Sequence, residues 1–244
     1  KITSPTGVNL NSVQVLSKTT IFIAGEDDHV LISTDGNSFT VSKTGEKSGW
    51  KDVHFIHPDT GVVGGHPTRM CYTTNGGKSW ITPAEWPASK SGIDAIHFYT
   101  NKIGYAIGGF RLLETLDGGR IWTDRGTSNT QSDFENFGDL HYMTTNRVFM
   151  TKSDGLYFST NSLDWTNKLL KCSKGKFHFV NDLGLYAGAT SDGLKGKAMF
   201  TSDNGVTWTS FSDVPSGNIF QDGRVFNSTN LLLVGDAGVI YKRK

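Results

Sequence analysis

The stretch Thr115-Leu-Asp-Gly-Gly-Arg-Ile-Trp-Thr123 sets the architecture of this chain, because variants of it recur along the 244 residues. The five copies carry Asp or Asn at the third position, and these residues are separated by 40, 42, 44 and 42 positions. The third residues are Asp35, Asn75, Asp117, Asn161 and Asp203. A near-constant period of this length indicates a repeat architecture, in which each copy marks one supersecondary unit.

Composition favours many short strands over one thick core. Hydrophobic residues make up 36% of the chain, and 29 Gly stand against 6 Pro, which is typical of strands joined by tight turns. The formal net charge of +1 argues against nonspecific binding to nucleic acid. No apolar run reaches the ~18 residues of a membrane span, so we expect a soluble chain. The chain starts at Lys1 rather than Met, so the compartment stays open between secreted, periplasmic and virion-associated.

Each repeat unit follows one template: two apolar strands joined by a turn, a loop, a third strand, the recurrent turn and a fourth strand. In the second unit these strands are Val53–Ile56, Gly61–Gly65, Met70–Thr74 and Ser79–Thr82. Residues 225–244 supply three strands and end before a sixth copy of the turn, whereas Ile2–Leu10 precedes the first unit without a partner. The economical arrangement is a ring in which the N-terminal strand completes the last unit, because closure leaves no exposed sheet edge.

We therefore predict an all-β fold, a six-bladed β-propeller that forms a single domain over residues 1–244. The predicted blades span residues 11–45, 50–83, 93–124, 138–168, 176–211, and 223–244 together with 1–10.

The recurrent segment, called the box turn below, has the chemistry of a tight turn. Its Asp or Asn can accept hydrogen bonds from following backbone N–H groups, and its glycines adopt positive φ at little steric cost. Its aromatic residue offers a large apolar surface between blades; the four tryptophans are Trp80, Trp122, Trp165 and Trp208, and Phe39 replaces Trp in the first copy. One carboxylate per turn is too few for calcium, which takes about six to eight oxygens, so we predict no metal and no cofactor.

These boxes resemble the Asp-box, or BNR, repeats of sialidase-type propellers. The fuller unit, Ile96-His-Phe-Tyr-Thr-Asn-Lys-Ile-Gly-Tyr-Ala-Ile-Gly-Gly109 followed by Leu113–Trp122, is similar to the repeat of the photosystem II assembly/stability factor family. The resemblance covers five of the six units and implies a propeller scaffold, which many functions share. It does not supply the arginine cluster, tyrosine nucleophile and acid/base aspartate that a sialidase would need, and the motifs of other nucleophilic enzymes are absent too.

In a propeller, the loops between second and third strands share a face with the connections between blades, opposite the box turns. Charged and aromatic side chains on such loops are typical of ligand or partner recognition. We predict a binding face from Asp27, His29, His66, Arg69, Trp86, Phe110, Arg111, Phe134 and Asp154.

Four histidines occupy one position of the first strand in consecutive units: His54, His97, His141 and His178. They could line a channel as a proton or metal site, but we interpret them as a structural feature of the repeat, hydrogen-bonded within or between blades. Cys71 and Cys172 are the only cysteines, and they fall at different places in different repeat units. We therefore expect no disulfide between them.

We predict a non-catalytic propeller that binds a protein partner through its loop face. The alternative is a glycan-binding module on a cell or virion surface, which would use Trp86 and the connection over residues 124–139. A small sialidase-like glycosidase is the second alternative, since a glycosidase needs two carboxylates only ~5–10 Å apart across a cleft. The oligomeric state and the identity of the ligand are left open.

Overall fold

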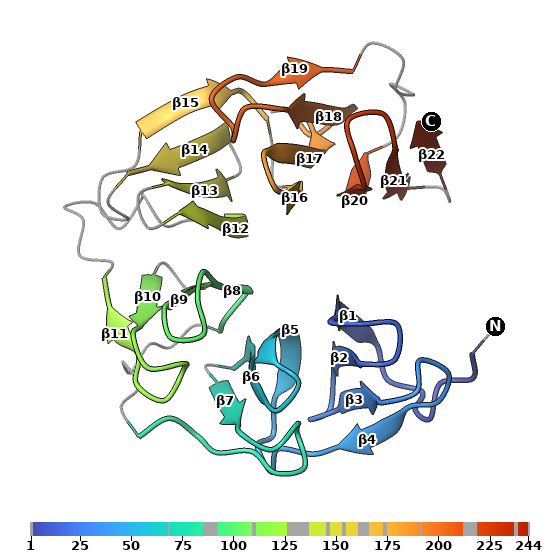
Figure 1. Cartoon of the computed structure of the whole chain (residues 1–244), viewed down its shortest axis with the longest axis vertical. Coiled ribbons are helices and arrows are strands. Elements are labelled where there is room, and N and C mark those ends of the chain that lie inside the picture. Colours follow the sequence, from blue (N-terminus) through green and yellow to red (C-terminus); the bar gives the residue numbers. More distant parts are fainter. Residues whose placement is uncertain are drawn as a thin grey trace. The chain divides into compact units, whose positions relative to one another are not determined.

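The computed structural model describes residues 2–67, 69–84, 92–108, 111–125, 137–144, 147–152, 155–160, 166–172, 175–190, 192–211, 219–236 and 239–243, with backbone alone at Arg69, Phe137, Thr144 and 166–170. Contacts divide the chain into two compact units, Lys1–Phe134 and Glu135–Lys244. The described part consists of β-strands in antiparallel sheets, three in each unit (Figure 1). The predicted all-β fold is therefore confirmed.

The first unit holds three sheets, each formed by consecutive strands of the chain. The first sheet consists of β1 (Leu10–Val15), β2 (Ile21–Gly25), β3 (Val30–Ser33) and β4 (Thr40–Ser42). The second consists of β5 (Gly49–His57), β6 (Thr60–His66) and β7 (Arg69–Thr73). The third consists of β8 (Ala95–Phe98), β9 (Gly104–Gly108), β10 (Arg111–Thr115) and β11 (Thr123–Asp124).

The second unit repeats this plan. Its first sheet consists of β12 (Phe137–Thr144), β13 (Arg147–Lys152), β14 (Gly155–Ser159) and β15 (Thr166–Leu170). The next consists of β16 (Gly175–Val180), β17 (Leu183–Ala189), β18 (Gly196–Thr201) and β19 (Thr209–Ser210). The last consists of β20 (Phe220–Val225), β21 (Leu231–Gly235) and β22 (Ile240–Arg243).

Two strand predictions need correction. The fourth strand expected at Ser79–Thr82 is reduced to one bridge, in which Tyr72 and Ile81 exchange backbone hydrogen bonds of 2.9 and 2.8 Å. Pro83 follows directly and has no N–H to extend the ladder, which explains why pairing stops there. Leu10, expected in a closing strand, instead begins β1, and residues 2–9 form no strand.

The cores lie between neighbouring sheets rather than inside any one of them. Phe22 of the first sheet and Phe55 of the second are stacked with ring centroids 3.4 Å apart, in a buried cluster with Trp50 and Val53. The middle strand β9 is buried along its whole length, because side chains on both of its faces meet a neighbouring sheet. Small residues are needed there: a Cβ on Gly64 would lie 2.5 Å from Ile93 Cγ2.

The described box turns share one set of local hydrogen bonds. In the third sheet, the buried Thr115 hydroxyl donates to Asp117 Oδ1 (2.9 Å) and accepts from Gly119 N (2.9 Å), while Arg120 N and Ile121 N donate to the same carboxylate oxygen (both 3.0 Å). The Ser38 hydroxyl and backbone N–H, with Asn37 N–H, hold the pKa of Asp35 well below its usual range. In the last described copy the Thr207 hydroxyl and N–H lower the pKa of Asp203 to about 2.

The box turns also pack against the preceding sheet. A Cβ on Gly77, whose φ is +79°, would lie 2.6 Å from Ile32 Cδ1 of β3. Trp80 donates its indole N–H to Ser42 Oγ of β4 (3.0 Å), and Trp122 is 2% exposed in the cluster shared by the second and third sheets. Trp208 lies edge-on to Phe149 of the preceding sheet, with centroids 6.1 Å apart. The copy with Asn161 and Trp165 lies outside the described residues.

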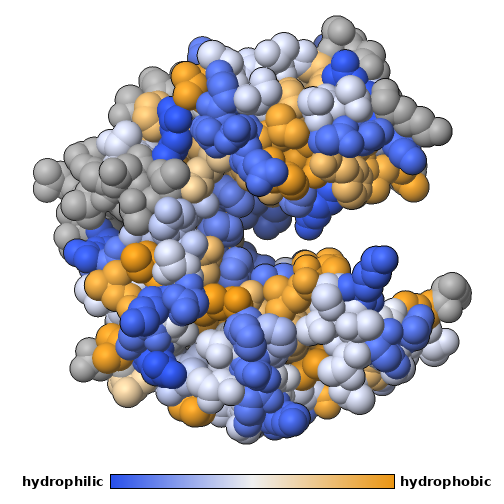
Figure 2. Space-filling view, viewed as in Figure 1, coloured by the Kyte–Doolittle hydropathy of each residue, from blue (hydrophilic) through white to orange (hydrophobic). Residues whose placement is uncertain are grey.

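Hydrophilic and hydrophobic residues are intermixed on the face that Figure 2 shows. Within the described residues, no helix has both the length and the apolar character needed to span a membrane. Cys71 and Cys172 are buried and are not joined by a disulfide. Burial raises the pKa of the Cys71 thiol to about 11, so this side chain is a packed neutral thiol.

Candidate functional site

A pocket of ≈ 600 Å³ lies in the first unit where three connecting segments meet. They are the β2–β3 loop, the β4–β5 connection and the β6–β7 loop. In the first two sheets, the loops between second and third strands therefore lie on the same face as the connection between the sheets, as expected. We call it the loop-face pocket; it is lined by Glu26, Asp27, Asp28, Gly45, Glu46, Lys47, Ser48, Gly49, Lys51, His66 and Pro67.

Asp28 fixes the shape of this pocket. Its Oδ1 accepts hydrogen bonds from Thr44 N (3.0 Å) and from the indole N–H of Trp50 (3.1 Å), and its Oδ2 accepts from Gly45 N (3.0 Å). Trp50 is fully buried, so its indole N–H needs a partner inside the protein. Asp28 thereby joins the β2–β3 loop to the β4–β5 connection and to β5. The backbone at Asp28 is left-handed, with φ of 61°, a conformation that Asp tolerates better than most residues.

The exposed charges of the pocket are mixed. Glu26 lies 3.6 Å from Lys51 Nζ and accepts a hydrogen bond from Asn9 Nδ2 (3.1 Å), while Glu46 accepts from the Thr82 hydroxyl (2.9 Å). The Asp27 carboxylate and the Lys47 ammonium have no such side-chain partner among the described residues. Both charges are therefore available to a ligand.

His66 forms the wall of the pocket nearest the third sheet. Its Nε2 lies 3.0 Å from Asp94 Oδ1, and its carbonyl oxygen accepts a hydrogen bond from the Ser48 hydroxyl (2.8 Å). Gly92 lies against the imidazole: a Cβ there would approach His66 Nδ1 to 2.2 Å. The ring is thus held in place from two sides.

The structure places the predicted binding residues in different settings. Asp27 and His66 line the loop-face pocket, and His29 lies in the β2–β3 loop with Nδ1 at 3.0 Å from the Glu26 carbonyl oxygen. Arg111 is not a loop residue: it begins β10, and its guanidinium is paired with Asp124 of β11, the neighbouring strand. Arg69 begins β7, where only the backbone is described, and four predicted residues lie outside the described part: Trp86, Phe110, Phe134 and Asp154.

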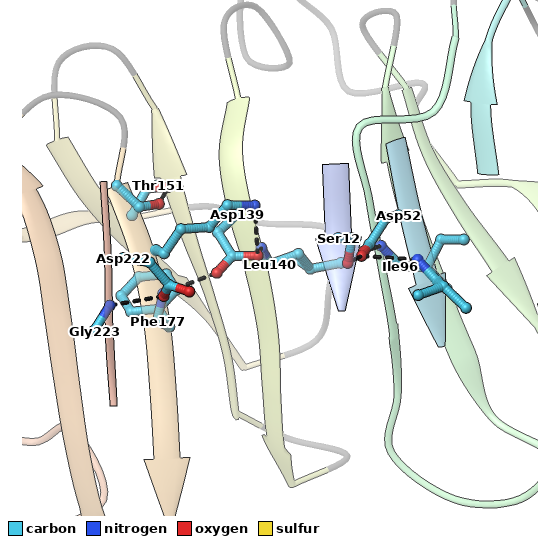
Figure 3. A network of polar contacts seen from close by, with 12 residues as sticks. Ser12, Asp52, Ile96, Asp139, Leu140, Thr151, Phe177, Asp222 and Gly223 are labelled. Carbon is cyan, nitrogen blue, oxygen red and sulfur yellow. Dashed lines mark hydrogen bonds and ion pairs between the residues drawn. The ribbon is translucent and has the colours of Figure 1, made fainter. Parts of the chain in front are cut away.

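A second polar feature runs along the first strands of the sheets (Figure 3). Asp52 of β5 accepts hydrogen bonds from the Ser12 hydroxyl of β1 (2.6 Å), from Val53 N (2.9 Å) and from Ile96 N of β8 (2.7 Å). This carboxylate ties together the first strands of all three sheets of the first unit. A β-bulge between Trp50 and Asp52 turns the side chain toward its neighbours.

The second unit uses the same device. Asp139 of β12 accepts from Leu140 N (3.0 Å) and from Phe177 N of β16 (2.8 Å), and Figure 3 shows both bonds. Asp222 of β20 accepts from Gly223 N (2.7 Å) and from Arg224 Nη1 (2.8 Å). These aspartates are not among the site residues that the sequence predicts. The signal that could have found them is the spacing Asp-x-His/Arg, which occurs at Asp52, Asp139 and Asp222.

The first-strand histidines have structural contacts. His54 and His97 lie edge to face with centroids 5.3 Å apart, and His141 stacks on Phe179 at 4.4 Å. His178 Nδ1 accepts a hydrogen bond from Val225 N of β20 (3.2 Å), which requires a neutral imidazole. The pKa values of His54 and His178 are lowered to about 4, chiefly by burial and, at His178, also by the nearby Arg224 guanidinium. Within the described residues, no group of three His, Cys, Asp or Glu side chains could hold a metal ion.

Searches of solved structures give matches over nearly the whole chain. An ancestral GH74 enzyme matches with a TM-score of 0.76 at 16% identity, over 97% of this chain and 36% of that enzyme. YCF48 from Cyanidioschyzon merolae matches with a TM-score of 0.77 at 15% identity, over 99% of this chain and 84% of that protein. A structure of YCF48 bound to D1 peptide matches with a TM-score of 0.52 at 17% identity, over 98% and 94% of the two chains.

These matches support a β-propeller fold. At such low identity they show the fold alone. A scan against protein-family models and a search of the curated proteins find no match.

Proposed function

We propose that this chain is a non-catalytic propeller module that binds a segment of a protein partner in the loop-face pocket. The observation that carries the proposal is the preformed wall around Asp28, whose bonds to Thr44, Gly45 and Trp50 order two connecting segments before any ligand arrives. A preordered site loses less conformational entropy on binding. The volume of ≈ 600 Å³ suits a few side chains of an extended segment.

The fold is compatible with this role, since the structure of YCF48 bound to D1 peptide has the same fold. Asp27 and Lys47 carry exposed charges of opposite sign. These charges would fix the orientation of the bound segment more than they would raise its affinity. Arg69, Trp86, Phe110, Phe134 and Asp154 remain proposed additions to this face, whereas Arg111 already has Asp124 as its partner.

We also propose that the six sheets are the blades of one closed ring. The last sheet contains the strands β20, β21 and β22, and β22 pairs with β21 through Leu231–Val234. The N-terminal residues 2–9, which form no strand in the structure, would supply the fourth strand. Deletion of residues 2–9 should then lower the melting temperature and broaden the transition, and an unchanged melting curve would refute closure by this segment.

Partner binding is tested by panning the purified chain against a randomised peptide library and measuring the selected peptides by fluorescence polarisation. We expect Lys47→Glu to weaken binding roughly tenfold, since it reverses a charge at the pocket. The matched control is Lys18→Glu, in the β1–β2 turn at the other end of the strands. Equal losses in both variants, or no selected peptide, would contradict the proposal.

The alternatives are separated by two further measurements. Binding to a neutral glycan array, lost in Trp86→Ala, would favour the glycan-binding module. Turnover of fluorogenic glycosides would favour the small glycosidase. The similarity to GH74 enzymes supports only the fold of this alternative.

A further inference from the structure

A second pocket, of ≈ 510 Å³, lies on the face of the first unit that carries the box turns. The second sheet contributes the β5–β6 hairpin and the end of β7. The third sheet contributes the β8–β9 hairpin and the box turn around Asp117. We call it the box-face pocket; it shares no lining residue with the loop-face pocket.

The walls of this pocket are fixed by backbone contacts. Gly118 N donates to the carbonyl oxygen of Lys102 (2.9 Å), which joins the box turn to the β8–β9 hairpin. The turn also lies directly on the second sheet, because a Cβ on Gly119 would be 2.6 Å from Val62 Cγ2. The positions from which Lys102 and Arg120 extend are therefore set by the fold.

The charge available in the box-face pocket is positive. Lys102 and Arg120 are exposed, and neither forms an ion pair with another described residue. Among the described residues that line this pocket, Asp117 alone has a carboxylate, and its Oδ1 already accepts hydrogen bonds from the Thr115 hydroxyl and from two backbone N–H groups of its own turn. Within the described lining, two cationic side chains without an ion-pair partner therefore stand against one carboxylate, whose Oδ1 is taken up by its own turn.

The rest of the lining suits a polyhydroxylated ring. Tyr72 is half-buried and presents an aromatic ring with a hydroxyl, and Thr60, Thr74 and Asn101 add hydroxyl and amide groups. The side chains of these four residues have no hydrogen-bond partner among the described residues. A few polar groups around an apolar surface are what fixes the orientation of a small ligand.

We propose that the box-face pocket binds an acidic saccharide, meaning a sugar that carries a carboxylate or sulfate beside its hydroxyls. The guanidinium of Arg120 and the ammonium of Lys102 would bind the anionic group through charge-assisted hydrogen bonds. Tyr72 would lie against the sugar ring, with Thr74 and Asn101 in reach of its hydroxyls. This site shares no residue with the proposed partner-binding site, and it lies on turns that also hold the sheets together.

The test is isothermal titration of the full chain with a heparin-derived oligosaccharide and with an oligogalacturonate, against neutral maltotriose as the uncharged probe. We expect binding of at least one acidic probe and not of maltotriose. Arg120→Gln and Lys102→Gln should each weaken that binding roughly tenfold, the effect of losing one charge-assisted hydrogen bond. Tyr72→Phe, which keeps the packing, should weaken it by a smaller factor.

The chain supplies matched controls. Lys78 follows Gly77 in the second box turn as Arg120 follows Gly119 in the third, and Lys18 occupies the β1–β2 turn as Lys102 occupies the β8–β9 turn. Lys78→Gln and Lys18→Gln should leave binding unchanged. The proposal is overturned if these controls weaken binding as much as the pocket variants do, or if neither acidic probe binds.

Discussion

Asp28 and Asp35 lie at opposite ends of β3, and both accept several hydrogen bonds from backbone N–H groups. The partners of Asp35 are Ser33, Asn37 and Ser38, all within three residues. The partners of Asp28 are Thr44, Gly45 and Trp50, which follow it by 16, 17 and 22 residues. The same side-chain chemistry therefore builds a local turn at one end of the strand and a pocket at the other.

This difference explains why one end repeats and the other does not. A turn that satisfies its own N–H groups can be copied from one sheet to the next, because it needs nothing from its neighbours beyond a packing surface. The bonds of Asp28 depend on the particular β4–β5 connection that follows the first sheet. The loop-face pocket lies at such a nonrepeated place, where the side chains differ from sheet to sheet.

The largest effect is expected from Asp28→Asn. This change keeps the size and the left-handed backbone but turns an acceptor into an NH2 donor opposite N–H groups, so the free energy of unfolding should fall by about 2–3 kcal/mol. Chemical denaturation followed by Trp fluorescence would measure it. Asp27→Asn is the matched neighbour and should cost less than about 0.5 kcal/mol. Similar losses in the two variants would mean that Asp28 does not organise the pocket.

A slightly smaller effect is expected from Asp52→Asn, which extends the comparison to a carboxylate that bridges three sheets. The variant loses one of the two carboxylate oxygens, either the acceptor for Ile96 N or the acceptor shared by Ser12 and Val53. The free energy of unfolding should therefore fall by about 2 kcal/mol. Asp94→Asn provides the control, because the Asp94 side chain is 43% exposed beside His66. This change should alter the free energy of unfolding by less than about 1 kcal/mol. If Asp94→Asn were the more damaging change, the first-strand bonds would not be the stronger connection between sheets.

Asp35→Ala tests the local end of β3. Because the affected N–H groups lie in an exposed turn and can bond to water, the loss of stability should be roughly half or less of that caused by Asp28→Asn. Differential scanning calorimetry of the two variants would compare them directly. A larger loss from Asp35→Ala would reverse the comparison.

Replacing a first-strand histidine should have the smallest effect on stability at neutral pH. Its effect should be larger in acid. The pKa of His178 falls from 6.5 to about 4 on folding, so the unfolded chain binds the proton first. Its contribution to stability is complete above pH 6.5 and is lost as the pH falls toward 4, by roughly 1–3 kcal/mol. The pKa of His54 is lowered in the same way, so its protonation also lowers the stability of the fold in acid.

Replacement by Gln has a precedent in the chain, because Gln14 occupies this position in β1 and bonds to the backbone of Phe55. His178→Gln should leave the melting temperature at pH 7.5 unchanged and flatten its decline between pH 6.5 and 4. His57→Gln, at a side chain that is 66% exposed, should not change that decline. Parallel declines for wild type and His178→Gln would show that His178 does not titrate with folding.

Much of the fold could be predicted from the sequence because its signals are local. The box turn around Asp117 brings its acceptor, its glycines and its Trp122 within a few residues, and the strand pattern repeats around it. One failed strand prediction also has a local cause, because Pro83 stops the fourth strand of the second sheet one residue pair after it starts.

The sequence by itself determined the repeat, the strand order and the turn chemistry of this protein. Only the tertiary structure decided that Asp28 holds Trp50, that Asp52 joins Ser12 to Ile96, that Arg111 has Asp124 as its partner, and that Lys102 and Arg120 share a pocket. The physical reason is the separation along the chain. A hydrogen bond within a turn is set by backbone geometry, whereas a contact across 13 to 44 residues depends on how strands and neighbouring sheets come together.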